Sequence, residues 1–146
     1  MPVITRFDHV GITVQDLEAV TAFFVDLGLE IQGRASVDGE FIDTVSGIPG
    51  SSTEIVMLHA PGGGTGVELA RYVAPEAEPG TPEARANVLG LRSIAFEVDG
   101  LQEIIEHLAA EGYTLDGGIG EYEAQWRMAY VRGPEGIIVA LAERLV

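Results

Sequence analysis

The chain has 146 residues, 47% of them hydrophobic, so it can bury a core but is no longer than one domain. Its 23 acidic residues outnumber 8 basic ones, and the net charge of −15 repels a phosphate backbone, which excludes nucleic acid as a partner. The acidity either keeps the protein soluble or attracts a cationic partner. There is no cysteine, no signal-peptide pattern and no apolar run long enough to span a bilayer, which excludes disulfides, thiolate metal sites and membrane insertion and favours a cytoplasmic protein.

The first half of the chain predicts a strand, a helix and three more strands. Residues 6–14 alternate polar and apolar side chains, which is typical of a half-buried strand. Asp16 is a candidate N-cap for a helix over residues 17–27, whose apolar residues share one face, and Gly28 is suited to end it. The three further strands, divided by the turn-rich SGIPGSS and APGGGTG, are expected at residues 29–37, 53–58 and 66–72.

The second half predicts the same order of elements. A Pro- and Gly-rich linker, residues 74–89, separates a first module at 1–73 from a second at 90–146. The second module begins with a strand near residues 91–98 and a helix over 101–110, with Asp99 as a possible cap and Gly112 as its stop. Its remaining strands are expected at residues 114–118, 127–131 and 136–142.

The two halves also repeat each other in sequence. The stretch DHVGITVQDLEAVTAFFVDLGLEIQG aligns without gaps with RSIAFEVDGLQEIIEHLAAEGYTLDGG, and VELA corresponds to VALA. This alignment sets His9 opposite Ser93 and Glu68 opposite Ala140. We therefore predict an α+β protein of two tandem βαβββ modules, which form a curved mixed sheet with helices on one face and an open cleft, where a ligand binds, on the other.

DHVGITVQDLEAVTAFF, GVELARY, GLRSIAFEVDGL and GPEGIIVALAERL together resemble the vicinal oxygen chelate superfamily, the group of glyoxalase I, methylmalonyl-CoA epimerase, extradiol dioxygenases and bleomycin-resistance proteins. The resemblance covers nearly the whole chain. It implies a cleft that in many members holds a divalent metal, with ligands at the positions of His9, Glu68, Ser93 and Ala140. It also implies a homodimer.

The implied metal site is degenerate, because Ser93 offers a weak ligand and Ala140 none. Only His9 and Glu68 remain, and His59 is the one plausible recruit. We therefore expect no cofactor, the alternative being a divalent metal (Zn, Ni, Mn, Fe or Co) bound with help from other groups. Without metal, a His9–Glu68 pair could act as an acid/base pair or anchor a polar group of a ligand.

The segment EYEAQWRMAYVRG concentrates large side chains around the only tryptophan. Strand alternation puts Trp126, Met128 and Tyr130 on one face, which either fills the core beneath the helix or lines the cleft. In the cleft, these side chains would suit a flat, unsaturated ligand. Tyr122, Phe41 and Ser93 are further candidates for ligand contact.

Two functions follow from these patterns. The first is a metal-free protein resembling the bleomycin-resistance branch, which sequesters a small hydrophobic or aromatic natural product. The second is an enzyme of the glyoxalase, lyase, epimerase or dioxygenase type, with or without a metal at His9 and Glu68. We favour binding because the substitutions at Ser93 and Ala140 remove ligands and do not exchange them.

Overall fold

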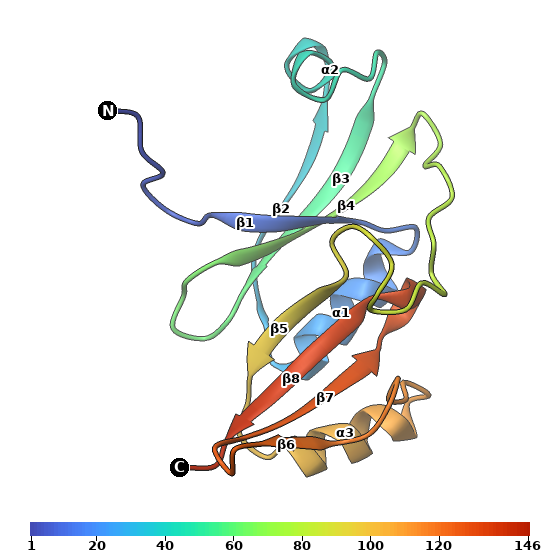
Figure 1. Ribbon diagram of the computed structural model, residues 1–146. Helices are drawn as coiled ribbons and strands as arrows, with labels where there is room; N and C mark the ends of the chain where they lie inside the picture. Colours follow the sequence, from blue (N-terminus) through green and yellow to red (C-terminus); the bar gives the residue numbers. More distant parts are fainter. The chain divides into compact units, whose positions relative to one another are not determined.

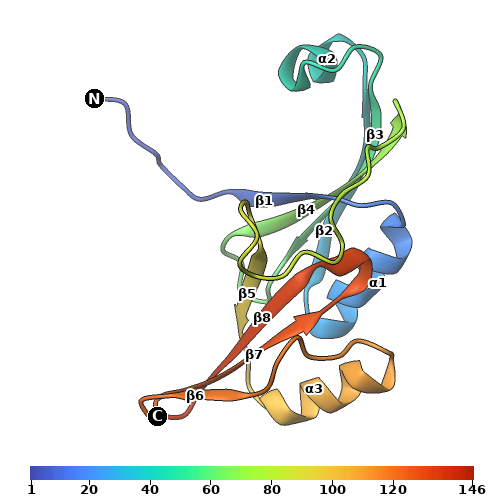
Figure 2. The same cartoon turned by 45° about the vertical axis from the view of Figure 1, so that its right-hand side comes forward.

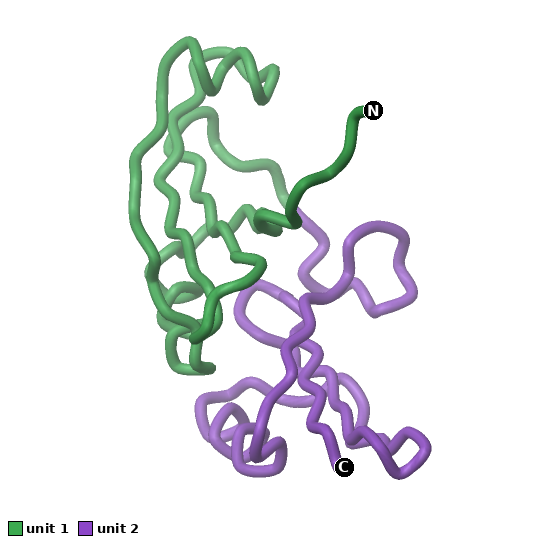
Figure 3. The backbone as a smooth tube through the Cα atoms, turned by 90° about the vertical axis from the view of Figure 1, so that its left-hand side faces the viewer, with its two compact units in different colours: residues 1–79 green, residues 80–146 purple.

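The computed structural model describes residues 1–146. The chain divides into two compact units, residues 1–79 and 80–146 (Figure 3). Each unit contains one four-stranded mixed sheet. The predicted linker, residues 74–89, includes the boundary between them.

The sheet of the first unit has the strand order β1-β4-β3-β2 (Figure 1). β1 runs parallel to β4, and the other two pairs are antiparallel. The elements are β1 (His9–Thr13), α1 (Leu17–Leu27), β2 (Glu30–Asp38), α2 (Glu40–Ser46), β3 (Ser52–His59) and β4 (Gly66–Ala74).

Helix α1 has the predicted bounds and the predicted caps. The Asp16 carboxylate accepts a hydrogen bond from the Ala19 N–H at 3.0 Å, and Gly28 ends the helix with φ 126°. The helix contacts β4 and β3, and its apolar face is buried with the side chains beneath it on those strands. The core of this unit comprises Leu17, Val20, Phe23, Phe24, Val56, Leu58, Val67 and Leu69.

Helix α2 was not predicted from the sequence. It has only seven residues, none of them buried, and no side chain caps its N-terminus. The loop that follows is held by Asp43, whose carboxylate accepts hydrogen bonds from the N–H groups of Gly50 and Ser51, both at 2.9 Å, and from the Ser51 hydroxyl at 2.8 Å. These bonds, led by that from Gly50, lower the pKa of Asp43. A helix this short carries too little periodicity to be recognised in a sequence.

The sheet of the second unit has the corresponding order β5-β8-β7-β6, again with one parallel pair, β5 and β8. Helix α3 contacts β7 and β8 (Figure 2). The elements are β5 (Ser93–Glu97), α3 (Leu101–Ala110), β6 (Gly120–Tyr122), β7 (Trp126–Arg132), a 3₁₀ turn (Pro134–Gly136) and β8 (Ile138–Arg144).

Helix α3 has the predicted bounds, but the expected cap at Asp99 is wrong. Gly100 occupies the N-cap position and no side chain from the preceding segment bonds there. Instead the Glu143 carboxylate accepts the N–H groups of Gly100 and Leu101, at 2.7 and 3.1 Å. A carboxylate on β8 thus satisfies the helix N-terminus, where a negative charge is also favoured by the helix dipole.

The strand expected at residues 114–118 is also wrong. Only Leu115 forms a bridge, to Val131, and the strand that pairs with β7 lies further along, at β6. The side chain of Arg132 holds the Asp116 carboxylate at 3.0 and 2.6 Å, and two glycines follow. The ion pair and the flexible Gly-Gly step end the pairing before a strand can form.

The two units repeat each other in structure as well as in sequence. At the end of the first strand of each, the Val14 N–H donates to Ala70 and the Val98 N–H donates to Ala142, both at 2.8 Å. The predicted α+β architecture of two βαβββ modules is therefore confirmed, with α2 as an addition to the first. No helix is long and apolar enough to cross a membrane.

Candidate functional site

One face of the first sheet is covered by α1, and the opposite face, here called its open face, carries Glu68. On β4 the neighbours Val67 and Leu69 are buried, and Glu68 points to the other side because side chains alternate along a strand. Glu68 pairs in register with Gly11 of β1, so His9, two residues earlier, lies on the same face. Alternation therefore brings together the two side chains that the sequence had suggested.

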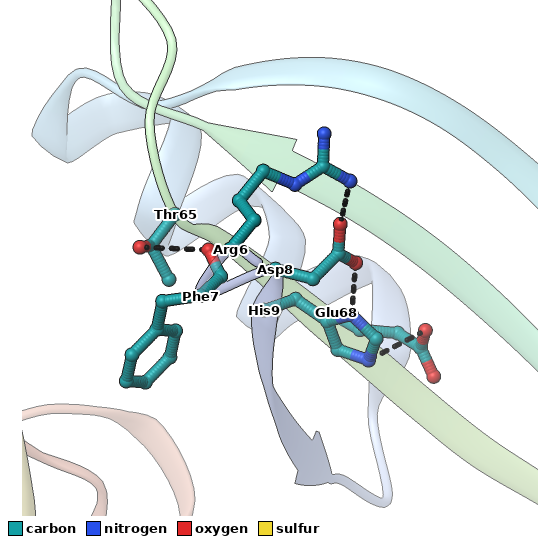
Figure 4. A network of polar contacts seen from close by, with 6 residues as sticks. All are labelled: Arg6, Phe7, Asp8, His9, Thr65 and Glu68. Carbon is teal, nitrogen blue, oxygen red and sulfur yellow. Dashed lines mark hydrogen bonds and ion pairs between the residues drawn. The ribbon is translucent and has the colours of Figure 1, made fainter. Parts of the chain in front are cut away.

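His9 and Glu68 are in contact (Figure 4). The Nε2 atom of His9 lies 3.4 Å from Oε2 of Glu68, and both side chains are partly exposed. The other ring nitrogen, Nδ1, lies 2.7 Å from Oδ2 of Asp8. The imidazole thus lies between two carboxylates, and only its protonated form can donate to both.

Asp8 is a member of this cluster that the sequence patterns did not single out. Its carboxylate also pairs with Arg6, and its hydrogen bond to His9, followed by that from Arg6, lowers the pKa of Asp8. A carboxylate on Nδ1 fixes the ring orientation and directs Nε2 toward Glu68. The only signal in the sequence is the adjacency of Asp8 to His9, which alone does not predict a contact.

The backbone before β1 is held close to the start of β4. The Thr65 hydroxyl donates to the Phe7 carbonyl at 3.2 Å (Figure 4). The Gly66 N–H donates to the Asp8 carbonyl at 2.9 Å. A larger residue at position 66 would be crowded, because a Cβ atom there would lie 3.0 Å from the Leu58 carbonyl oxygen. These contacts hold the backbone of Phe7 and Asp8 against the start of β4.

The second sheet also has an open face, on the side opposite α3, and it carries the aromatic segment. On β7 the odd-numbered Ala129 and Val131 are buried, whereas Met128 and Tyr130 are 39% and 37% exposed. Trp126 lies on the same face by alternation, and Tyr122 of β6 pairs with it in register. The sequence left open whether these side chains fill the core beneath the helix or lie on the opposite face. They lie on the opposite face, and Tyr122, Trp126, Met128 and Tyr130 are here called the aromatic face.

Arg144 joins this aromatic face and was not foreseen. It is the register partner of Trp126 on β8, and its guanidinium carbon lies 4.4 Å from the centroid of the indole ring. This is the distance of a cation–π contact. The guanidinium also lies 3.5 Å from the Glu97 carboxylate. Eighteen positions separate the arginine from the tryptophan, so only the strand register, which the sequence does not reveal, brings them together.

The other predicted contact residues are dispersed. Phe41 lies on α2 and is 72% exposed, beyond the end of the sheet where Asp38 pairs with Ser52. Glu68 pairs with Met57, well away from that end. Ser93 begins β5 on the open face of the second sheet, as His9 begins β1.

Comparison with known proteins identifies the family. Residues 8–130 match the family model of the glyoxalase/bleomycin resistance protein/dioxygenase superfamily. The chain belongs to this superfamily. A glyoxalase family protein from Bacillus cereus is 35% identical over 99% of this chain and 97% of its own, with a TM-score of 0.95. No curated protein is significantly similar to the sequence.

More distant solved structures share the fold. A glyoxalase family protein from Enterococcus faecalis is 23% identical, with a TM-score of 0.62, over 95% of this chain and 98% of its own. TnmS3, an antibiotic-binding protein from Streptomyces sp. CB03234, is 19% identical, with a TM-score of 0.64, over 99% of both chains.

The donor set of the chain fits the metal site of the superfamily only in part. The 3.4 Å between His9 Nε2 and Glu68 Oε2 matches the roughly 3.4 Å expected between two ligands of one tetrahedral ion. In the second unit, however, Ser93 and Ala140 occupy the corresponding places, since Ala140 pairs with Ala95 as Glu68 pairs with Gly11. Catalytic sites normally have about three protein ligands. The residues at the implied positions supply two good donors, His9 and Glu68, which is one fewer than a catalytic metal site normally has.

His59 stays the candidate recruit for a third ligand, because alternation puts it on the same open face as Met57, which pairs with Glu68. Without a metal, the cluster of Asp8, His9 and Glu68 can bind a polar or cationic group, or exchange a proton, through its own side chains.

Proposed function

We propose that this member of the superfamily is a metal-free binding protein that holds a small hydrophobic or aromatic molecule, such as a natural product, without transforming it. The observation that carries the proposal is the open aromatic face of the second sheet. Large apolar side chains left uncovered on a sheet usually mark a binding surface. Rigid aromatic rings give a flat ligand a large contact area at low entropic cost.

The chemistry of the degenerate metal positions supports the same function. Ser93 and Ala140 cannot replace a histidine and a carboxylate as ligands. The chain therefore lacks ligands that metal catalysis requires and that binding of a small molecule does not. The name of TnmS3, an antibiotic-binding protein, adds support, because it indicates that a protein of this fold can bind an antibiotic.

Calorimetric titration with a panel of polyaromatic antibiotics tests the proposal. Met128→Glu introduces a charge on the aromatic face without touching a buried residue, and should weaken binding at least about tenfold while the fold is retained. Ala109→Glu, on the exposed surface of α3, adds the same charge elsewhere and should bind like wild type. Equal binding by both variants would show that the aromatic face is not the site.

An enzymatic function is the second candidate, and the Asp8–His9–Glu68 cluster favours it. A histidine oriented by one carboxylate and facing another has the arrangement of a general acid or base. Turnover of a glyoxalase, epimerase or dioxygenase substrate that is lost in Glu68→Gln would favour this candidate over binding. Full activity and unchanged metal content in Glu68→Gln would exclude it.

We also propose that the protein forms a homodimer, as the sequence resemblance implies. The exposed apolar side chains of α2, Phe41 and Val45, are available for such a contact. Light scattering on the purified protein should give twice the mass of one chain, and a mass of one chain at all concentrations would contradict the proposal.

A further inference from the structure

The β6–β7 hairpin fixes the position of two aromatic rings. Its turn, Tyr122 to Gln125, closes with a hydrogen bond of 2.9 Å from the Gln125 N–H to the Tyr122 carbonyl. The two central residues, Glu123 and Ala124, have φ values of 49° and 54°, which are uncommon for residues other than glycine. This tight turn sets Tyr122 directly opposite Trp126, so the rings extend from one face of neighbouring strands.

The cation beside this pair has unused donors. Arg144 on β8 lies opposite Trp126 on β7, and its only polar partner is Glu97, at 3.5 Å. Both side chains of that ion pair are more than half exposed, so the pair is weak and easily exchanged. A guanidinium stacked on a ring keeps its N–H groups in its own plane, free to form paired hydrogen bonds with an anion.

We propose that Tyr122, Trp126 and Arg144 form a subsite for a planar aromatic acid. The aromatic ring of the ligand contacts Tyr122 and Trp126, while its carboxylate or phenolate binds Arg144 and replaces Glu97. This inference rests on the proposed function and adds to it the chemical class of the ligand. A planar aromatic acid needs both an aromatic surface and a cation in contact with that surface, and this subsite provides the two together.

The net charge of −15 does not oppose this selectivity at short range. Charges more than about 8 Å away are largely screened at physiological salt. At the subsite the ligand anion competes with the Glu97 carboxylate for Arg144. A neutral ligand of the same shape would leave the arginine with its weak intramolecular partner and gain only the ring contact.

Titration calorimetry with 2-naphthoate and 2-naphthamide at neutral pH tests the subsite. The two probes have the same ring, and only the first is an anion. Wild type should bind the acid at least about tenfold more tightly than the amide, as expected for a charge-assisted pair of hydrogen bonds. In Arg144→Gln that preference should fall to about twofold or less, with the affinity for the amide unchanged. Arg85→Gln, which removes the same charge from an exposed arginine without a partner, should behave like wild type.

The outcomes separate this inference from the function on which it rests. Equal affinity of wild type for acid and amide, or an acid preference that survives in Arg144→Gln, would overturn the subsite and leave the binding function standing. Failure of both naphthalene probes, while polyaromatic antibiotics still bind, would also overturn the subsite alone. Failure of the probes and of the antibiotics would overturn both.

Discussion

The substitution Gly136→Ala should destabilise the second unit strongly. Gly136 ends the 3₁₀ turn with φ 80°, and a Cβ atom there would lie 2.1 Å from the carbonyl oxygen and 2.5 Å from the Cα atom of Pro82. Both contacts are with backbone, so the segment around Pro82 has to move. That segment is tied down by Arg132, which donates to the carbonyls of Ala84 at 2.8 Å and of Pro82 at 3.3 Å.

The magnitude follows from two contributions. A left-handed conformation costs a residue other than glycine about 1–2 kcal/mol. Moving the Pro82 segment weakens hydrogen bonds to a charged group, each of which contributes about 1.5–3 kcal/mol, less where water can replace them. We therefore expect a loss of about 3 kcal/mol, or a fall of roughly 12 °C in the melting temperature at about 4 °C per kcal/mol.

Thermal unfolding followed by circular dichroism is the assay, and Gly118→Ala is the matched control. Gly118 belongs to the same unit, has no positive φ and would have no atom within 4 Å of an added Cβ, so the control should unfold like wild type or slightly later. Melting temperatures for Gly136→Ala and Gly118→Ala that agree within a few degrees would refute the close approach of Pro82 to this turn.

Three further predictions concern single interactions. Because the pKa of Asp43 is lowered in the fold, its bonds to Gly50 and Ser51 stabilise the loop above the ordinary value of 3.8 and are lost as the pH falls through the lowered pKa. The protection factor of the Gly50 amide, which corrects for the intrinsic exchange rate, should therefore fall at acid pH, whereas in Asp43→Asn it should already be low at neutral pH and change little with pH. Ala124→Gly should stabilise the protein by about 0.5–1 kcal/mol in urea unfolding, and a destabilisation would show that the positive φ carries no strain. Glu143→Ala should cost about 1–2 kcal/mol of stability through loss of the α3 cap, whereas an unchanged urea midpoint would mean that water caps the helix equally well.

The parts of the fold that short-range patterns control were predictable. The bounds of α1 follow from an aspartate before the helix and a glycine after it, both acting within a few residues. The cap of α3 was predicted at Asp99 and is supplied by Glu143, some forty positions away, which no local pattern can indicate. Helix α2 was missed because fewer than two turns leave no clear periodicity.

In the candidate site, too, short-range patterns predicted some contacts, and others depend on the three-dimensional structure. His9 and Glu68 were predicted to share a face from strand alternation and the internal repeat, and the structure brings them to 3.4 Å. Asp8 and Arg144 were not predicted, because the first contact depends on a side-chain rotation and the second on strand register. The exposure of Trp126 could not be decided either, since alternation assigns a residue to a face without saying which face the helix covers.

The most direct test of the central claim is titration of Trp126 fluorescence with polyaromatic antibiotics, using protein stripped of metal by a chelator. Trp126 is the only tryptophan, so the signal reports the aromatic face alone. We predict saturable quenching that is unchanged when Zn, Ni, Mn, Fe or Co is added back. No saturable quenching by any compound, or quenching that appears only after a metal is restored, would contradict the account of a metal-free binding protein.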